Sequence, residues 1–420
     1  MKRKIWKVIR WIAYLGVGYF IIIILFFGHS EVNEKQGTYT FYWSGLNAIF
    51  DQDKEFGFSN KKIVETKLDG ADGPYLIGDI SYTINEHNKL SATPVSVGAP
   101  VEVVVNHPAI KSFIVTRKIL HRPESQIYPA PKKLVAISDI EGNFGGFYSF
   151  LFNNKIIDQK GTWIFGNGHL VLNGDFVDRG KQVLPVLWLI YNLEQQAEAA
   201  GGKVHFILGN HEIMMMQGNV SYAHAKYIEA SKQISRKTYW NEAMRYLYAE
   251  NTELGKWLRT KNVIEKIGSS IFVHAGLNIE HVHAGLTINK FNKIAGAHYG
   301  IPNPSTYADN QVRLTVSAAG PYWDRGLAMD ITHKILFWYN GINPTETTQE
   351  QLNHILKYYQ ASKIIIGHSV VDDIQADYQQ KVIKIDVRHG EQMKSGKTKG
   401  ISMENGKVFK VDDQGTKRSI

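Results

Sequence analysis

The sequence predicts an α/β fold over residues 133–390, a mixed β-sheet sandwich flanked by helices. Short apolar runs of buried-strand type recur there, at 134–137, 171–172, 204–208, 271–273 and 363–366. The stretch 182–198 carries apolar residues at helical spacing between two of these runs, which indicates a βαβ unit. Each run ends in a turn that holds acidic, amide or imidazole groups, and ligands bind at the carboxyl ends of strands in such sheets.

The 420 residues are 44% hydrophobic and 21% charged, which is typical of a globular protein with a large core. The formal net charge is +9, but the first ten residues hold five basic and no acidic side chains, so the rest of the chain carries 9 − 5 = +4. The sequence has no basic stripe with interleaved aromatic residues, and we expect no nucleic-acid partner. The lack of cysteine excludes disulfides, zinc–thiolate sites and a thiol nucleophile.

The first 27 residues are predicted to be a targeting element, with a basic cytoplasmic head at 1–10 and an uncharged transmembrane anchor at 11–27. The uncharged part is at the lower length limit for a membrane span and slightly longer than a usual signal-peptide core. We favour an anchor over a cleaved signal because no small-x-small cleavage site follows. The bulk of the chain is then expected on the non-cytoplasmic side, the periplasm in a bacterium, and it is secreted if the segment is cleaved.

Residues 37–121 are predicted to form a small β-rich module. Its β-prone runs, at 38–43, 101–105 and 113–116, are separated by Gly, Pro, Asn and Asp. No catalytic set of residues lies in this stretch. Residues 122–132 contain Pro123, Pro129 and Pro131 and are the predicted linker.

The α/β part is predicted to begin with the strand at 134–137 and a helix from Phe144. A mostly helical insertion is expected at about 213–267, in which Met214, Met215 and Met216 pack in the core. The run 381–385 is expected to close the sheet. Residues 391–420 are predicted to form a polar C-terminal hairpin that turns at Asn405-Gly406.

Five strand ends present side chains that bind metals. The candidates are Asp139, Glu141, Asp175, Asn210, His274 and His368. Asp and Asn are ordinary turn residues, which explains a single loop but not such sets on successive loops. Carboxylate, amide and imidazole groups together suit a pair of divalent ions rather than a structural zinc. Two ions about 4 Å apart activate a water and hold the attacking and leaving oxygens of a phosphoryl transfer.

The same loops carry further groups that phosphoryl transfer needs. Arg179 and Arg325 can hold the non-bridging phosphate oxygens with planar guanidinium groups. His211, oriented by Asp178, can donate a proton to the leaving oxygen, which contributes roughly 10²–10⁴-fold to the rate.

Five motifs occur in order along the chain: Asp139-x-Glu141-Gly142, Gly174-Asp175-x-x-Asp178-Arg179-Gly180, Gly209-Asn210-His211-Glu212, His274-Ala275-Gly276 and Gly367-His368. This series resembles that of the calcineurin-like metallophosphoesterases. The ending Asp178-Arg179-Gly180 resembles the phosphoprotein phosphatase branch. The segment 209–217 and Trp323-Asp324-Arg325-Gly326 look most like its bacterial-type, Shewanella-like members. The resemblance covers about 133–390 and does not extend to residues 1–130.

The resemblance implies a metallophosphoesterase-type sandwich and a phosphatase that uses two divalent ions. It implies a first metal held by Asp139, the residue at 141 and Asp175, and a second held by Asp175, Asn210, His274 and His368. It also implies His211 with Asp178 as the general-acid pair, and Arg179 and Arg325 as phosphate-binding residues. The expected substrate is a phosphorylated protein or a small phosphorylated metabolite, with an extracytoplasmic nucleotide or sugar phosphatase as the alternative.

Glu141 departs from the family, in which a histidine stands at this position. An oxygen ligand makes the first site harder and favours Mn²⁺ or Mg²⁺ over zinc. Mn²⁺ is the preferred ion, and Fe, Zn and Mg are the alternatives. In a second interpretation Glu141 binds no metal and the site holds one ion. A third is a non-catalytic phosphate-binding relative.

Other polar residues are weaker candidates. His283 lies in a repeat of the His274 motif, but only His274 follows an apolar strand. His205 is expected to be a hydrogen-bonded strand residue, and His281 and His389 have weak claims. Glu212 is expected to hold a neighbouring backbone or ligand, or to lie at a helix N-terminus, without binding metal.

Overall fold

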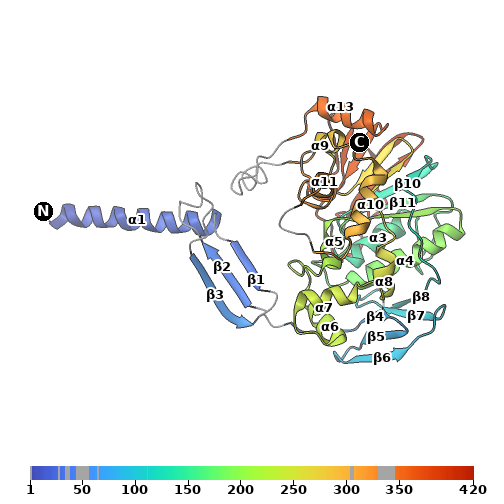
Figure 1. The fold of residues 1–420 in the computed structure, drawn as a ribbon, viewed down its shortest axis with the longest axis horizontal. Helices are drawn as coiled ribbons and strands as arrows, with labels where there is room; N and C mark the ends of the chain where they lie inside the picture. Colours follow the sequence, from blue (N-terminus) through green and yellow to red (C-terminus); the bar gives the residue numbers. More distant parts are fainter. Residues whose placement is uncertain are drawn as a thin grey trace. The chain divides into compact units, whose positions relative to one another are not determined.

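The computed structural model describes residues 2–26, 29–33, 38–43, 56–63, 66–110, 112–302, 307–329 and 346–420 (Figure 1). These residues fall into two compact units, one with the described residues up to Thr66 and one with residues 67–329 and 346–420. The ends of two predicted segments, Phe27 and Gly37, lie outside the described residues.

The first unit contains helix α1 (Lys2–Phe26) and an antiparallel sheet of β1 (His29–Asn33), β2 (Thr38–Trp43) and β3 (Phe56–Ile63). The uncharged part of α1 begins only at Trp11 and is shorter than the roughly 20 apolar residues that span a bilayer. Within the described part of the chain, no helix has the length and apolar character to cross a membrane, so the predicted transmembrane anchor lacks support.

The second unit begins with two small antiparallel sheets. One holds β4 (Asp72–Ile77), β5 (Ile80–Ile84) and β6 (Leu90–Pro94), and the other β7 (Pro100–Val104) and β8 (Ser112–Thr116). Strand β4 packs against helices α4 and α8 of the main fold, as Figure 1 shows. The stretch predicted as one β-rich module therefore contributes to both units.

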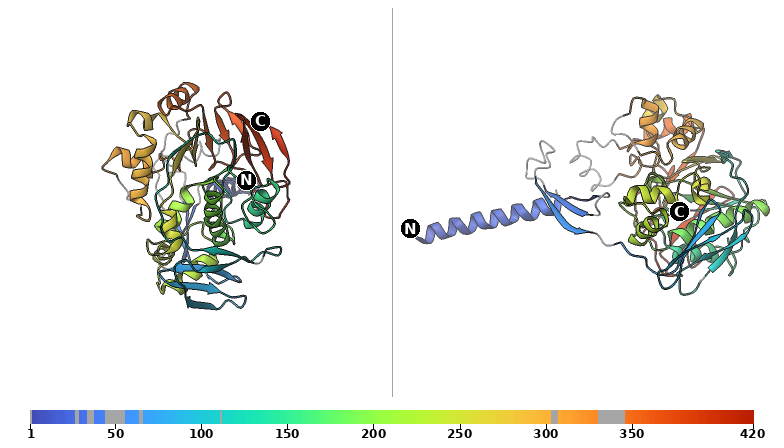
Figure 2. Two further views of the ribbon diagram at one scale, coloured as in Figure 1. Left: turned by 90° about the vertical axis from the view of Figure 1, so that its right-hand side faces the viewer. Right: turned by 60° about the horizontal axis from the view of Figure 1, so that its bottom comes forward.

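Two six-stranded sheets form the main fold (Figures 1 and 2). The first has the order β12-β11-β10-β18-β19-β20 and the second β16-β17-β15-β14-β13-β9. The first consists of β10 (Lys133–Ile137), β11 (His169–Asn173), β12 (Lys203–Ile207), β18 (Lys399–Glu404), β19 (Lys407–Asp412) and β20 (Lys417–Ser419). The second consists of β9 (Ile127–Tyr128), β13 (Ile264–Ile267), β14 (Ser270–Val273), β15 (Lys363–Ile366), β16 (Gln375–Asp377) and β17 (Val382–Lys384).

The core lies between these sheets. Ala136 and Val171 of the first sheet belong to the same buried cluster as Phe272 and Ile365 of the second. Strands β10, β11 and β12 run parallel, whereas β18 pairs antiparallel with β10. Apolar side chains on the facing surfaces of two sheets make a sandwich. The predicted mixed-sheet α/β sandwich is confirmed.

Helices surround the sandwich. Helix α3 (Phe144–Asn153) contacts α4 (Val183–Ala199), which packs on β12. The insertion holds α5 (Asn210–Gln217), α6 (Ala225–Ser235), α7 (Trp240–Leu247) and α8 (Glu253–Leu258) before β13. Met214, Met215 and Met216 are buried there, as predicted. Later helices are α9 (Ile279–His283), α10 (Ile288–His298), α11 (Asn310–Val316) and α13 (Gln349–Tyr358).

The C-terminal segment completes the first sheet. Strands β18 and β19 turn at Asn405 and Gly406, whose φ angles are 50° and 76°. Two successive residues with positive φ are typical of a type I′ hairpin turn, and the predicted hairpin is present. Because β18 pairs with β10, this hairpin lies beside the first strand of the α/β part.

Candidate metal centre

The first two strand-end loops are bound to each other through their backbones. The N–H of Asp139 donates to the carbonyl of Gly174 at 2.9 Å, and that of Glu141 to the carbonyl of Asp175 at 3.0 Å. Asp139 and Asp175 have φ angles of 54° and 59°, in the left-handed region. Such conformations cost energy in non-glycine residues and collect at functional sites. The loops thus hold two carboxylates in fixed positions.

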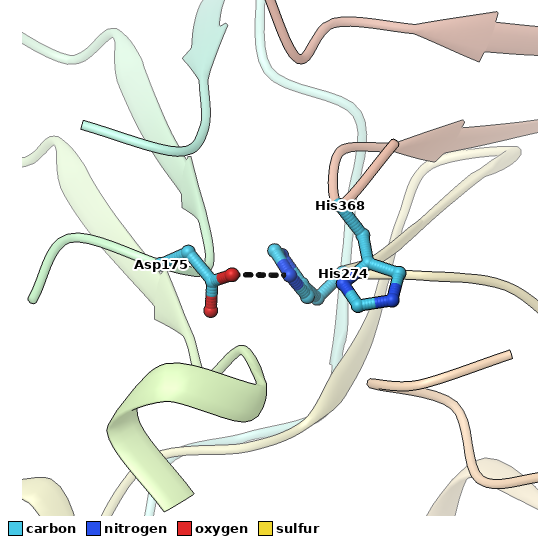
Figure 3. A group of neighbouring side chains, drawn as sticks. All are labelled: Asp175, His274 and His368. Carbon is cyan, nitrogen blue, oxygen red and sulfur yellow. Dashed lines mark ion pairs between the residues drawn. The ribbon is translucent and has the colours of Figure 1, made fainter. Parts of the chain in front are cut away.

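Asp175, His274 and His368 form a cluster whose candidate ligand atoms lie within 4.8 Å of one another. Figure 3 shows the Asp175 carboxylate facing the His274 ring, with Oδ2 at 3.0 Å from Nε2, and His368 beside it. Nδ1 of His274 lies 2.8 Å from the carbonyl of Asn173 and donates to it, which turns Nε2 towards the cluster. Three loops from both sheets therefore meet at one point.

The donor atoms at this point suit a cation. Nε2 of His368 and Oδ1 of Asn210 are buried and have no hydrogen-bond partner among the described residues, and Nε2 of His274 faces the Asp175 carboxylate. A buried polar atom without a partner costs about 1–3 kcal/mol. A divalent ion bound to these atoms would remove that cost, and imidazole, amide and carboxylate are suitable ligands. The residues present fit a divalent metal.

The charges in the cluster act strongly on one another. Burial raises the pKa of Asp139 to about 6, with His274 opposing the rise and Asp175 adding to it. Burial lowers the pKa of His274, but Asp175 and Asp139 outweigh it and raise that pKa to about 10. Burial, Arg325 and His274 hold the pKa of His368 well below its usual range. A metal at this centre therefore competes with a proton on His274.

Asp139 borders the cluster through a backbone contact. The N–H of His368 lies 3.2 and 3.3 Å from the two carboxylate oxygens of Asp139. Glu141 is placed differently. Its carboxylate pairs with the guanidinium of Arg179, and these side chains are 25% and 48% exposed. Glu141 thus lies at the edge of the site together with Arg179. The role of Glu141 as a metal ligand stays a prediction.

His211 and Asp178 form a buried pair, with Nδ1 of the imidazole 2.8 Å from Oδ2 of the carboxylate. The backbone N–H of His211 donates to Asp175 Oδ1 at 3.0 Å, and its Nε2 lies 3.8 Å from Asp175 Oδ2. Burial lowers the pKa of His211, but Asp175 and Asp178 raise it to a net value above the usual one. The imidazole is therefore fixed beside the cluster with Nε2 on the cluster side.

Glu212 holds the loops together. Its carboxylate accepts the backbone N–H groups of Asp175, Phe176 and Gly209 at 3.0, 2.7 and 2.8 Å, and its side chain is fully buried. These bonds join the loop after β11 to the start of α5. The expectation that Glu212 holds neighbouring backbone agrees with this geometry.

Arg325 reaches the cluster from the loop before residue 330. Its Nη1 donates to Ser369 Oγ at 2.8 Å and to the carbonyl of His368 at 3.2 Å. The ring of Trp323 stands edge-on to that of His368, 5.9 Å between centroids. A guanidinium thus lies on the His368 side of the centre.

A cavity of about 720 Å³ opens next to Asp139, Glu141 and Arg179. Its wall combines residues from distant parts of the chain: Asn106, Lys181, Gln182, His224, Asp386, Arg388, His389 and Glu391. Gln182 donates to the carbonyl of Asn106 at 2.7 Å, so the β-rich segment before the linker contributes to this wall. The cavity is large enough for a phosphorylated side chain or a small metabolite.

Comparison with known proteins identifies the family. The calcineurin-like phosphoesterase family matches residues 132–372, more than half of the chain. The chain belongs to this family. Its members hydrolyse phosphoric esters with divalent metals, and the predicted resemblance is confirmed.

Relatives place this phosphoesterase in the Shewanella-like branch. The crystal structure of a cold-active protein-tyrosine phosphatase from a psychrophilic Shewanella species is 31% identical, with a TM-score of 0.71 over 84% of this chain and 99% of that one. Shewanella-like protein phosphatase 2 of Arabidopsis thaliana is 27% identical over 62% of this chain and 72% of that protein. Shewanella-like protein phosphatase 1 of Plasmodium berghei is 28% identical over 63% and 69%.

The four histidines with weaker claims, His205, His281, His283 and His389, lie outside the cluster. His205 is buried between Glu265 and His169, with ring nitrogens 2.7 and 2.9 Å from them. His283 is exposed on α9. Nε2 of His281 lies 2.8 Å from the carbonyl of Ala319, and that of His389 lies 2.8 Å from the carbonyl of Ser138. The preference for His274 over His283 agrees with the geometry.

Sequence reasoning missed four residues at the centre. Ser369 fixes Arg325, the carbonyl of Asn173 orients His274, and the ring of Tyr222 lies 4.9 Å from that of His211. Nothing in the sequence marks these three. Asp386 follows the run 381–385, and the strand-end rule that selected the candidate ligands would have selected it too.

Proposed function

We propose that the chain is a metal-dependent phosphomonoesterase of the protein phosphatase type. The observation that carries the proposal is the meeting of the Asp175, His274 and His368 cluster with the His211–Asp178 pair. The cluster offers unpaired donor atoms for a cation, and the pair offers a proton donor beside them. The similarity to protein phosphatases supports the choice of a phosphorylated protein as the substrate.

Asp139, Asp175, Asn210, His274 and His368 would hold two divalent ions, for which we propose Mn²⁺. When bound, such ions lower the pKa of a water to near neutrality and neutralise charge on the transferred phosphoryl group. The protein itself keeps these ligands fixed. Glu212 anchors the backbone at Asp175 by two hydrogen bonds, and Asn173 fixes the ring of His274.

His211 is proposed as the general acid. With Nδ1–H donated to Asp178, the protonated imidazole carries its second proton on Nε2, which faces the cluster. A leaving alkoxide needs such a proton, and the ordered carboxylate keeps the ring in the orientation that delivers it. Asp178 is the positioning residue of this pair.

Arg325 and Arg179 are proposed to bind the phosphate. Arg325 is held by Ser369 and by the carbonyl of His368, and its charge lies next to the cluster. Arg179 lines the cavity, and its guanidinium lies over the ring of Tyr222, with 5.4 Å to the centroid. Two guanidinium groups can bind the three non-bridging oxygens from different sides.

The test uses the full chain, stripped of metal and then given Mn²⁺, Fe²⁺, Zn²⁺ or Mg²⁺ in turn. Hydrolysis is followed on an aryl phosphate and on phosphotyrosine and phosphoserine peptides. We expect metal-dependent turnover that Asp175→Ala and His211→Ala abolish or reduce by at least 100-fold. The placement of the enzyme on the non-cytoplasmic side stays a prediction, tested by protease access in intact cells.

Several results would overturn the proposal. A folded, metal-loaded protein that binds phosphate without turnover would be a binding protein. Turnover of phosphodiesters but not of monoesters would give the centre a different reaction. Strong preference for a nucleotide or sugar phosphate over both peptides would keep the proposed metal-dependent hydrolysis but reject a phosphorylated protein as the substrate.

A further inference from the structure

Asp386 lies at the same sheet edge as the ligands of the metal centre. Strand β17 pairs in parallel with β15, with Lys384 opposite Ile366, and the N–H of Ile385 donates to the carbonyl of Ile366 at 2.8 Å. Asp386 stands two residues beyond Lys384, as His368 stands two residues beyond Ile366. Beyond these strands Val371 pairs with Val387, and the N–H of Val371 donates to the carbonyl of Asp386 at 2.9 Å, so Asp386 lies beside the loop that follows His368.

The side chain of Asp386 is buried and has no partner. The residue is 3% exposed, and its carboxylate makes no hydrogen bond or ion pair with any residue that the structure describes. It lines the cavity together with Asp139. Of the charged groups nearby, Asp139 acts on it most strongly, ahead of His274 and Asp175.

Asp139 and Asp386 are buried carboxylates that line one cavity and repel each other, so a positive charge between them would be stabilising. Burying an unpaired ionised group costs far more than burying a neutral polar one. Of the basic residues that line the cavity, Arg179 is paired with Glu141, Lys181 is paired with Asp69, and Arg388 is exposed. The histidine that the family places at position 141 is also missing, so the first metal lacks one of its expected ligands. A cation between Asp139 and Asp386 would meet both needs.

We propose that Asp386 is an oxygen ligand of the first metal, together with Asp139 and Asp175. The inference rests on the proposed two-metal centre but not on turnover. Three carboxylates make a hard site, which favours Mn²⁺ or Mg²⁺ over Zn²⁺. Glu141 then stays with Arg179 at the edge of the cavity, and the missing histidine is compensated from a different strand.

The test is calorimetric titration of the metal-free full chain with Mn²⁺. Asp386→Asn keeps the size of the side chain and removes its charge, and Asp372→Asn makes the same change at an exposed position. We expect two Mn²⁺ per wild-type chain and per control chain, and at least tenfold weaker binding of one of them in Asp386→Asn. Equal affinities for both ions in Asp386→Asn would overturn the inference.

Thermal unfolding separates a ligand from a structural residue. Because Asn has the same size as Asp and carries no charge, the melting temperature of the metal-free protein should be equal or higher, while the rise on adding Mn²⁺ becomes smaller. A lower melting temperature without metal, combined with an unchanged Mn²⁺ affinity, would mean a structural role and refute the proposal. If Asp386→Asn does not fold, Asp386→Glu displaces the carboxylate by one methylene, and unchanged Mn²⁺ binding in that variant would refute it equally.

The same measurements distinguish a failure of the ligand role of Asp386 from a failure of the proposed phosphatase function. An inactive protein that binds two Mn²⁺ and loses one with Asp386→Asn refutes the phosphatase and keeps the ligand. If the wild-type chain binds only one Mn²⁺, the first metal site does not exist and this inference is refuted.

Discussion

Replacing Glu141 by glutamine tests what this residue does in place of the family's histidine. In the structure its carboxylate holds Arg179, one of the two arginines proposed to bind phosphate. The pair competes with substrate for the same guanidinium. We therefore expect Glu141→Gln to strengthen phosphate binding and to leave Mn²⁺ binding unchanged.

The expected size follows from the exposure of the pair. The side chains of Glu141 and Arg179 are 25% and 48% exposed. Ion pairs exposed to solvent contribute about 0.2–1 kcal/mol. Freeing Arg179 should thus tighten the binding of inorganic phosphate about 1.5- to 5-fold. Because screening weakens exposed pairs, the gain should shrink at high salt.

The assay measures the inhibition constant of inorganic phosphate in the Mn²⁺-loaded enzyme, and the Mn²⁺ affinity by calorimetry. Glu391→Gln is the matched control, because Glu391 is an exposed carboxylate in the wall of the same cavity. A general loss of negative charge would change both variants alike. A tenfold loss of Mn²⁺ affinity in Glu141→Gln, with weaker phosphate binding, would refute this reasoning and make Glu141 a metal ligand.

Three further changes give measurable results. In stopped-assay kinetics, His211→Asn should lower kcat by roughly 10²–10⁴-fold and leave Mn²⁺ binding unchanged. A kcat within tenfold of wild type would exclude His211 as the general acid. Glu212→Ala leaves three buried N–H groups without acceptors and should lower the free energy of unfolding in urea by about 3 kcal/mol or more. The control Glu102→Ala, at an exposed position, should change it by almost nothing. A loss below about 1 kcal/mol in Glu212→Ala would contradict the role of Glu212. Burial raises the pKa of Glu124, but Lys261 and Lys203 outweigh it and lower that pKa from 4.5 to about 2. This carboxylate contributes roughly 3 kcal/mol of stability above pH 4.5, and the contribution is lost as the pH falls towards 2. The difference in unfolding free energy between the wild type and Glu124→Gln should therefore vanish over that interval. A difference that stays constant with pH would contradict this role of Glu124.

Much of the fold follows from local sequence patterns. The runs at 134–137, 204–208, 271–273 and 363–366 consist mostly of apolar residues, and they contribute strands buried in the sandwich. The same patterns place the polar residues that follow them at one edge. The meeting of Asp175, His274 and His368 therefore follows from the sequence pattern.

The remaining features depend on tertiary contacts that no local pattern encodes. Residues 122–132 look like a linker because of their prolines, yet Ile127 and Tyr128 form β9 and pair with β13. The segment 37–121 has uniform β-prone composition, and only its contacts assign β4 to the main fold. The pairing of Glu141 with Arg179 joins two loops 38 positions apart, so residue type alone suggested a metal ligand.

The pairing of β18 with β10 has a consequence for how the protein is made. Strand β10, which leads into Asp139, acquires its second neighbour from residues 399–404, near the end of the chain. The side chain of Asn143 likewise donates to the carbonyl of Gly390 at 2.6 Å. During synthesis the ribosome releases these partners long after β10, and until then β10 has an open edge that can pair with another chain. In a nascent chain the loop after β10 therefore cannot reach its final structure until residues 399–404 have been made. Products truncated before residue 399 should aggregate and should not retain weak activity.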